Sequence, residues 1–255
     1  MQLVDTHCHI HSLDYPLDRE LVYSNAISDG LIGLVCVGTD LEDSLRACIF
    51  TSDHQKTWAS IGIHPYMADK YHCDNKTTNK FEELLSKDKV VAIGECGLDY
   101  FYNNSSKIAQ KEILRMQIRL AQKNNLPIIF HVRSAFDDFW PIVDEFSFRN
   151  GVIHSFSDSL HNMDQAIKRD FYLGVNGIAT FTKNQEQIKM YKSVPLSNLV
   201  LETDSPFLTP SPLRGTICEP KYISITAKFL ADLRSESLEL IIKKTSKNSQ
   251  KLFNF

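Results

Sequence analysis

Short apolar runs recur along the chain and alternate with segments of helical periodicity. The runs at 31–37 and 126–130 are almost continuously apolar, which is typical of parallel strands that are covered on both faces. The pattern predicts eight strands, at residues 2–5, 32–38, 57–63, 90–95, 127–132, 151–154, 171–175 and 199–203.

Helical patterns fill most of the intervals between these strands. Between 110 and 123, Ile113, Leu114 and Ile118 recur among charged residues, and Asn124, Asn125 and Pro127 mark the helix end. Helices are expected at 41–49, 79–87, 110–123, 135–146, 161–169, 184–192, 221–232 and 236–246. This alternation over 255 residues predicts an α/β fold, a (β/α)8 TIM barrel that forms a single domain over 1–255. A doubly wound open sheet is the alternative.

Histidines and carboxylates stand at the ends of several apolar runs. His7 and His9 follow the first run two residues apart, so in a strand they project to the same side and could bind one metal ion. Glu95, His131, His154 and Asp204 end the fourth, fifth, sixth and eighth runs. Barrel active sites lie at these strand ends, whereas an open sheet would gather ligands from two or three strands. The ligand set therefore favours the barrel and a metal centre at one of its mouths.

The composition narrows the class of protein. Hydrophobic residues make up 43% of the chain, but no apolar run approaches the length of a membrane span. The first residues lack a signal-peptide pattern, and the six cysteines show no CxxC spacing, so we expect a cytoplasmic protein. We also expect a monomer without membrane contacts. The formal net charge of −3 is unlike that of proteins that bind nucleic acid nonspecifically. A phosphate-bearing substrate would have to be attracted locally.

An ordered set of motifs occupies residues 5–9, 62–65, 94–99, 127–133, 154–157 and 202–206. Together these motifs resemble those of the TatD family, metal-dependent deoxyribonucleases of the amidohydrolase-like barrel superfamily. Two departures from the family pattern are visible. The family often has Cys-Phe-x-Gly after the histidine, where this chain has Ser155 to Asp158, and it tends to have Asn where Cys218 precedes Glu-Pro.

The resemblance implies a two-metal site. Glu95 would bridge the two divalent ions, and the terminal ligands would be His7, His9 and Asp204 on one ion and His131 and His154 on the other. Two ions about 3.5–4 Å apart would hold a bridging hydroxide as the nucleophile. Glu95 and Asp204 are the expected catalytic residues, Asp204 as the base. Four histidines suit Zn, Mn, Ni or Co better than Mg, although the family includes enzymes that work with magnesium.

Four further residues are assigned to the surroundings of the metals. His64 and Arg133 are expected to bind substrate phosphate, since the planar guanidinium fork matches a phosphate group. The alternative for Arg133 is an ion pair with Asp99 or Glu202. Asp99 and Glu202 are themselves expected to orient histidine ligands.

The activity implied by the resemblance is cleavage of phosphodiester bonds of DNA, in single strands or from 3′ ends in the 3′–5′ direction. Three alternatives stay open: hydrolysis of aminoacyl esters or C–N bonds within the same superfamily, hydrolysis of small phosphoesters, and a non-catalytic metal-binding scaffold. Amide hydrolases of the superfamily often bridge their metals with a carboxylated lysine. No lysine lies near the end of the fourth run, where Glu95 stands, and this disfavours amide hydrolysis.

Overall fold

The computed structural model describes residues 2–102 and 104–255, and the fold is the predicted (β/α)8 barrel. Its strands follow one another in chain order in one eight-stranded sheet within these residues. They are β1 (Leu3–Cys8), β2 (Leu31–Val37), β3 (Thr57–Ile61), β4 (Val90–Asp99), β5 (Ile128–Arg133), β6 (Gly151–Ile153), β7 (Tyr172–Val175) and β8 (Leu199–Leu201).

The chain divides into two compact units. The first unit comprises Met1–Cys36 and His154–Phe255, and in it β1 pairs with β2 and β7 pairs with β8, all in parallel. The segment that follows β8 runs along β1, because Asp204 N donates to His7 O at 2.8 Å and His9 N donates to Ser205 O at 2.8 Å. The second unit, Val37–Ile153, holds the parallel pairs from β3 to β6.

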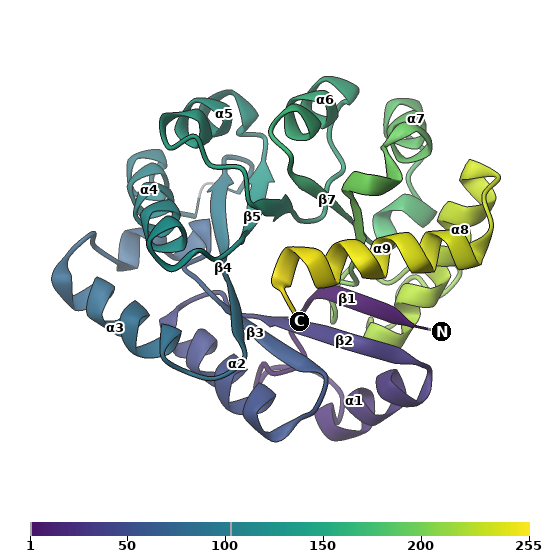
Figure 1. Cartoon of the computed structure of the whole chain (residues 1–255), viewed down its shortest axis with the longest axis horizontal. Helices are drawn as coiled ribbons and strands as arrows, with labels where there is room; N and C mark the ends of the chain where they lie inside the picture. Colours follow the sequence, from purple (N-terminus) through teal and green to yellow (C-terminus); the bar gives the residue numbers. More distant parts are fainter. Residues whose placement is uncertain (1, 103) are drawn as a thin grey trace. The chain divides into compact units, whose positions relative to one another are not determined.

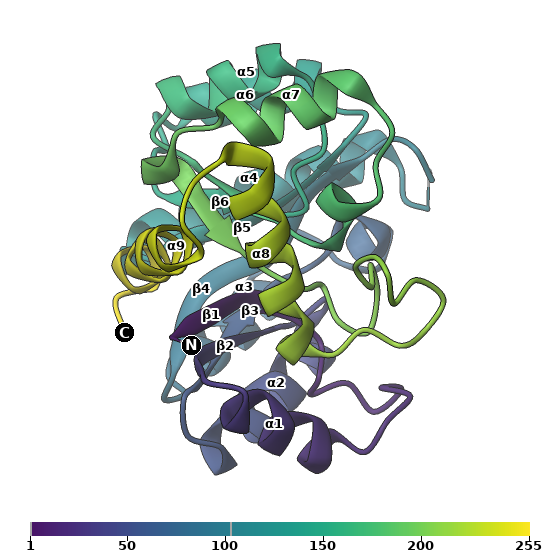
Figure 2. The same ribbon diagram turned by 90° about the vertical axis from the view of Figure 1, so that its right-hand side faces the viewer.

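Helices pack against the strands within each unit. The first unit contains α1 (Arg19–Ser28), α6 (Leu160–Lys168), α7 (Gln185–Ser193), α8 (Ile223–Arg234) and α9 (Leu238–Phe253), and the second contains α2 (Leu41–Asp53), α3 (Asn75–Leu85), α4 (Lys107–Asn124) and α5 (Phe136–Glu145). Helix α9 lies along β1 and β8 (Figure 1), and α6 and α7 lie side by side (Figure 2). Short 3-10 helices occupy Pro65–Lys70, Gly177–Thr180, Leu196–Asn198 and Pro220–Tyr222. In the part of the chain described, every helix is too short or too polar to cross a bilayer.

The structure corrects the predicted elements at several places, since β1 extends to Cys8 rather than residue 5 and α9 to Phe253 rather than residue 246. Two further corrections have a clear physical cause. Helix α1 was not predicted, because it buries only Val22 and Ala26 and leaves Leu21 exposed, so no apolar stripe marks it. Strand β4 runs four residues past Glu95, so the expectation that Glu95 ends the strand was wrong. The strand continues because residues 96–99 are buried and pair with β5.

Candidate active site

One group of buried ligand atoms lies in the first unit, where His7 of β1 meets two residues that follow β6 and β8. The rings of His7 and His154 stack with their centroids 4.0 Å apart, and His154 Nδ1 lies 3.6 Å from Glu202 Oε1. Each of the three residues offers one ligand atom, and these atoms lie within 4.8 Å of one another. His7 and Glu202 are fully buried, and His154 is nearly so.

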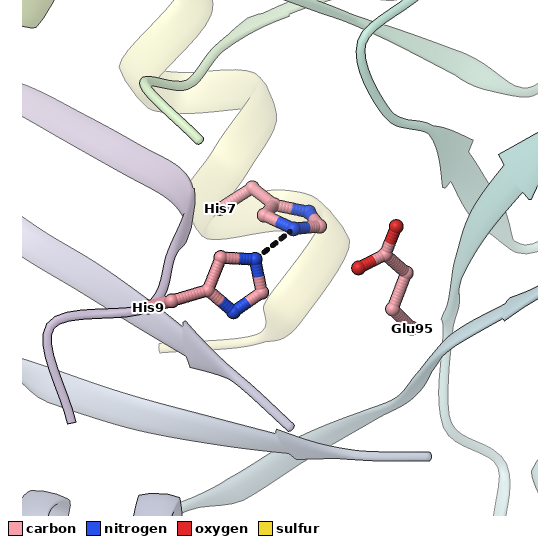
Figure 3. A group of neighbouring side chains, drawn as sticks. All are labelled: His7, His9 and Glu95. Carbon is pink, nitrogen blue, oxygen red and sulfur yellow. Dashed lines mark hydrogen bonds between the residues drawn. The ribbon is translucent and has the colours of Figure 1, made fainter. Parts of the chain in front are cut away.

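His9 and Asp204 extend this group. The Nε2 atoms of His7 and His9 lie 3.2 Å apart (Figure 3), and Asp204 Oδ1 lies 3.5 Å from the first and 3.4 Å from the second. Two imidazole nitrogens and a carboxylate oxygen therefore face one another, which is a donor set that divalent transition metals prefer. The residues present thus fit a metal ion. Burial acts to raise the pKa of Asp204, but the hydrogen bond with His9 and the nearby histidines outweigh it, so this pKa lies below its usual value.

Glu202 is fixed by neighbours on its own unit. Its Oε1 accepts hydrogen bonds from Ser155 N at 2.6 Å and from Asn176 Nδ2 at 3.1 Å. A Cβ at Gly174 of β7 would lie 2.2 Å from Glu202 Oε2, so only glycine leaves room for the carboxylate there. A carboxylate held this firmly beside His154 can fix the orientation of that ring. Asn176 was missed in the sequence, where its place after an apolar strand is the only signal.

A second group lies in the other unit and consists of His64, Glu95 and His131. His131 Nδ1 lies 2.8 Å from Glu95 Oε1, and His64 Nε2 lies 3.6 Å from the same oxygen. The Glu95 carboxylate, also drawn in Figure 3, belongs to β4 and is only 4% exposed. The nitrogen and oxygen atoms of these three side chains that could bind a metal ion again lie within 4.8 Å of one another.

The backbone fixes the tautomer of His64. Its Nδ1 accepts a hydrogen bond from Tyr66 N at 3.1 Å, as the cap of the 3-10 helix that follows. A neutral ring therefore carries its proton on Nε2. An Nε2–H group is a hydrogen-bond donor and not a metal ligand, so in this tautomer only Glu95 and His131 of the group have atoms for a metal ion.

Asp99 contacts the opposite side of the His131 ring. Its Oδ2 lies 2.9 Å from His131 Nε2 and accepts a hydrogen bond from Tyr66 Oη at 3.0 Å, while Oδ1 accepts from the amides of Phe101 and Tyr102. Burial raises the pKa of Asp99, but the hydrogen bonds from His131, Tyr102 and Tyr66 lower it to about 2. Asp99 is thus a carboxylate whose two oxygens serve different neighbours, and its predicted contact with a histidine is present.

Two buried glutamines of α4 hold the ends of β3 and β4, and both were missed in the sequence. Gln117 bonds the amide and the carbonyl of Ile63, next to His64. Gln110 accepts from Asp99 N at 2.8 Å and donates to Asp99 O at 3.1 Å and to Ser105 O at 2.9 Å. The available signal was a pair of polar residues seven apart on the apolar face of a predicted helix.

Gln110→Leu is expected to lower the free energy of unfolding by about 1–3 kcal/mol, because it leaves the buried Asp99 amide without an acceptor. Urea denaturation followed by circular dichroism measures this change. Gln122→Leu, on the exposed face of the same helix, is the matched control and should cost less. Equal losses for the two variants would show that the Gln110 side chain does not support the end of β4.

Arg133 ends β5 with an exposed side chain. Its guanidinium lies over the rings of Phe101, 4.2 Å from the centroid, and Tyr102, 4.7 Å from the centroid. It forms no ion pair with a carboxylate in residues 2–102 and 104–255, so the alternative of a pair with Asp99 or Glu202 is not observed. Its charge is therefore available to an anion.

Comparison with known proteins gives consistent results over the whole chain. Residues 4–254 match the model of a family described as TatD related DNase. The metal-dependent hydrolase YabD of Bacillus subtilis (strain 168) is 37% identical over 253 residues, 98% of each chain. A protein of Cronobacter sakazakii named 3′-5′ ssDNA/RNA exonuclease TatD is 29% identical over 258 residues, 98% of this chain and 97% of its own. The crystal structure of YjjV, a TatD homolog from Escherichia coli K12, superimposes with a TM-score of 0.92 at 28% identity, covering 99% of this chain and 98% of YjjV.

Proposed function

The chain belongs to the TatD-related DNase family and is a metal-dependent hydrolase, and on this basis we propose that it cleaves phosphodiester bonds of DNA. The observation that carries the proposal is Arg133, an exposed guanidinium without a carboxylate partner in the described residues, two positions beyond His131. A guanidinium in this setting suits the charge and the planar oxygen pairs of a phosphate. A neutral ester or amide would give it no partner.

Six residues are proposed as the metal ligands. His7, His9 and Asp204 would bind one divalent ion, His131 and His154 the other, and Glu95 has two oxygens with which to bind both. When bound, such ions offset charge on the phosphoryl oxygens and lower the pKa of water. Four histidines favour Zn, Mn, Co or Ni.

The carboxylates beside two of these histidines select the atoms that bind metal. Asp99 accepts from His131 Nε2, which leaves Nδ1 as the ligand atom, and Glu202 lies beside His154 Nδ1, which leaves Nε2. A histidine that donates its other N–H to a carboxylate is held in one orientation and is a more basic ligand. Asp99 and Glu202 are therefore proposed to position these two rings.

Three further roles are proposed: removal of a proton from the attacking water by Asp204, and binding of the substrate by His64 and Arg133. Asp204, whose pKa is lowered, is ionised at neutral pH and can accept the proton of the attacking water. His64 donates from Nε2, and Arg133 offers its fork to the phosphate. The substrate is proposed to be single-stranded DNA or a 3′ end cleaved in the 3′–5′ direction, as the name of the Cronobacter relative describes. The six cysteines of this chain are all free thiols, which suits a reducing compartment such as the cytoplasm, and we propose that location for the protein.

Arg133→Lys tests the substrate class. Lysine keeps the charge but loses the two-pronged geometry, so kcat/KM on single-stranded DNA should fall about 10- to 100-fold. Wild type and variant are assayed on single-stranded DNA, duplex DNA, RNA, a chromogenic phosphodiester and a neutral p-nitrophenyl ester, each with Zn, Mn, Co, Ni and Mg, and metal content is measured in both proteins.

The ester provides the control, because it carries no phosphate and should be hydrolysed equally by both proteins. Equal losses on DNA and ester would mean that Arg133 supports the fold or the metal ligands. A wild-type protein that hydrolyses the ester and none of the phosphodiesters would overturn the proposed function.

A further inference from the structure

Two large aromatic side chains are exposed directly after β4. Phe101 is 59% exposed and Tyr102 is 53% exposed, and their rings meet edge to face with centroids 4.9 Å apart. Exposed apolar side chains that lie next to one another, rather than singly, often mark a binding site. Neither ring is needed for the assumed metal binding or proton transfer.

Of the two rings, Phe101 has fewer contacts within the described part of the protein and is therefore more available to a ligand. Tyr102 also meets the edge of Tyr66, with centroids 5.7 Å apart. The preceding Tyr100 already has partners within the protein, because its hydroxyl donates to Asp138 and Lys107 lies over the face of its ring. Phe101 has no polar atom to satisfy, and the ring and cation contacts described for it are those with Tyr102 and Arg133.

A single carboxylate ties these rings to the proposed reaction centre. Asp99 Oδ1 accepts hydrogen bonds from the amides of Phe101, at 2.9 Å, and Tyr102, at 3.1 Å. Its other oxygen lies 2.9 Å from His131 Nε2. The backbone that carries the rings is therefore held by the same group that holds a proposed metal ligand, so this backbone lies at a fixed place beside it.

The cation beside the rings selects the kind of molecule that could cover them. An apolar protein surface packed on Phe101 would also cover Arg133 and leave a buried charge without a partner, which is costly. A nucleotide offers both complements at once, an aromatic base for the ring and a phosphate for the guanidinium.

We propose that Phe101 is a base-stacking residue, on which a nucleobase next to the scissile phosphate stacks while Arg133 binds the phosphate and Tyr102 supports the guanidinium. This inference rests on the proposed function and specifies its substrate. A base inside a duplex is covered on both faces by neighbouring base pairs, so single strands and frayed ends are preferred over intact duplex. Every base has a π-face, so the preference is independent of sequence.

The test compares a normal oligonucleotide with one that is abasic at its last two 3′ positions. Phe101→Ala should raise KM on the normal strand about 5- to 150-fold, the range that corresponds to loss of one base–aromatic stack. On the abasic strand, wild type and Phe101→Ala should have the same kinetics. Phe101→Trp should restore the wild-type KM, whereas Phe101→Leu, which keeps apolar bulk without a ring, should not. Ile49→Ala, an exposed apolar residue of α2, is the matched control and should leave KM unchanged.

A binding measurement gives a readout that needs no turnover. In the Glu95→Gln background, a strand ending in 2-aminopurine should lose fluorescence on binding when Phe101 is present and keep it in Phe101→Ala. If wild type cleaves both strands and Phe101→Ala loses equally on both, base stacking is refuted and DNA cleavage stands. If wild type cleaves neither strand with any metal, the proposed function fails and this inference fails with it.

Discussion

Glu95→Gln is expected to lower kcat by about 10³-fold or more while the protein stays folded. Glutamine has nearly the same shape, so the buried site in β4 accommodates it, but it removes the negative charge that faces His131 and His64. A neutral amide is a poor ligand for two cations. Losing the charge of the metal ions beside the phosphoryl group would raise the activation free energy by several kcal/mol, and each increase of about 1.4 kcal/mol lowers the rate about tenfold. We would measure kcat across a metal titration together with bound metal per protein.

Glu83→Gln, on the exposed face of α3, is the matched control and should behave as wild type. Thermal unfolding of both variants separates a loss of metal from a loss of fold. Wild-type turnover by Glu95→Gln at limiting metal would show that Glu95 does not hold the ions and would remove the bridging role proposed for it.

The fold was predictable because the information that fixes it is local and repeated. A run such as 31–37 is apolar at nearly every position only if both faces of the strand are covered, and this places it in a parallel sheet without knowledge of its neighbours. Helix α1 was not predicted because it buries only two residues and so has no apolar stripe in its sequence. The end of β4 was not predicted because Gly97 and Asp99 are residue types that are uncommon in strands, whereas pairing with β5 keeps these residues in the strand.

The grouping of side chains in the candidate site was predictable where it depends on residues close together in the chain, and was not where it depends on distant partners. His7 lies in β1 and His9 directly follows its last residue, Cys8, so the extended chain there brings the two rings, two residues apart, to the same side. The carboxylate of Asp5 accepts hydrogen bonds from the amide and hydroxyl of Thr203, 198 residues away, and no local pattern reveals such a pair. Gln110 belongs to the same class, since its partners lie on another element.

Asp204→Asn is the other substitution with a large expected effect, about 10²- to 10⁴-fold in kcat, the usual contribution of a positioned base. Asn removes the charge beside His7 and His9 but keeps an oxygen acceptor of the same reach. It also suits the backbone, because Asp204 has φ of 58°, a left-handed conformation that Asn adopts more readily than most residues, whereas Ala would add strain there.

The measurement that separates the two proposed roles of Asp204 is kcat at saturating metal. A residue that only binds metal can be compensated by mass action, so kcat would recover as metal is raised. A residue that also removes the proton cannot, so we expect kcat to stay at least about 10²-fold below wild type when bound metal has returned to the wild-type level. Asp170→Asn, exposed and with φ of 60°, has the same backbone conformation and should leave kcat unchanged. Full recovery of kcat in Asp204→Asn would reduce Asp204 to a metal ligand and require another base for the reaction.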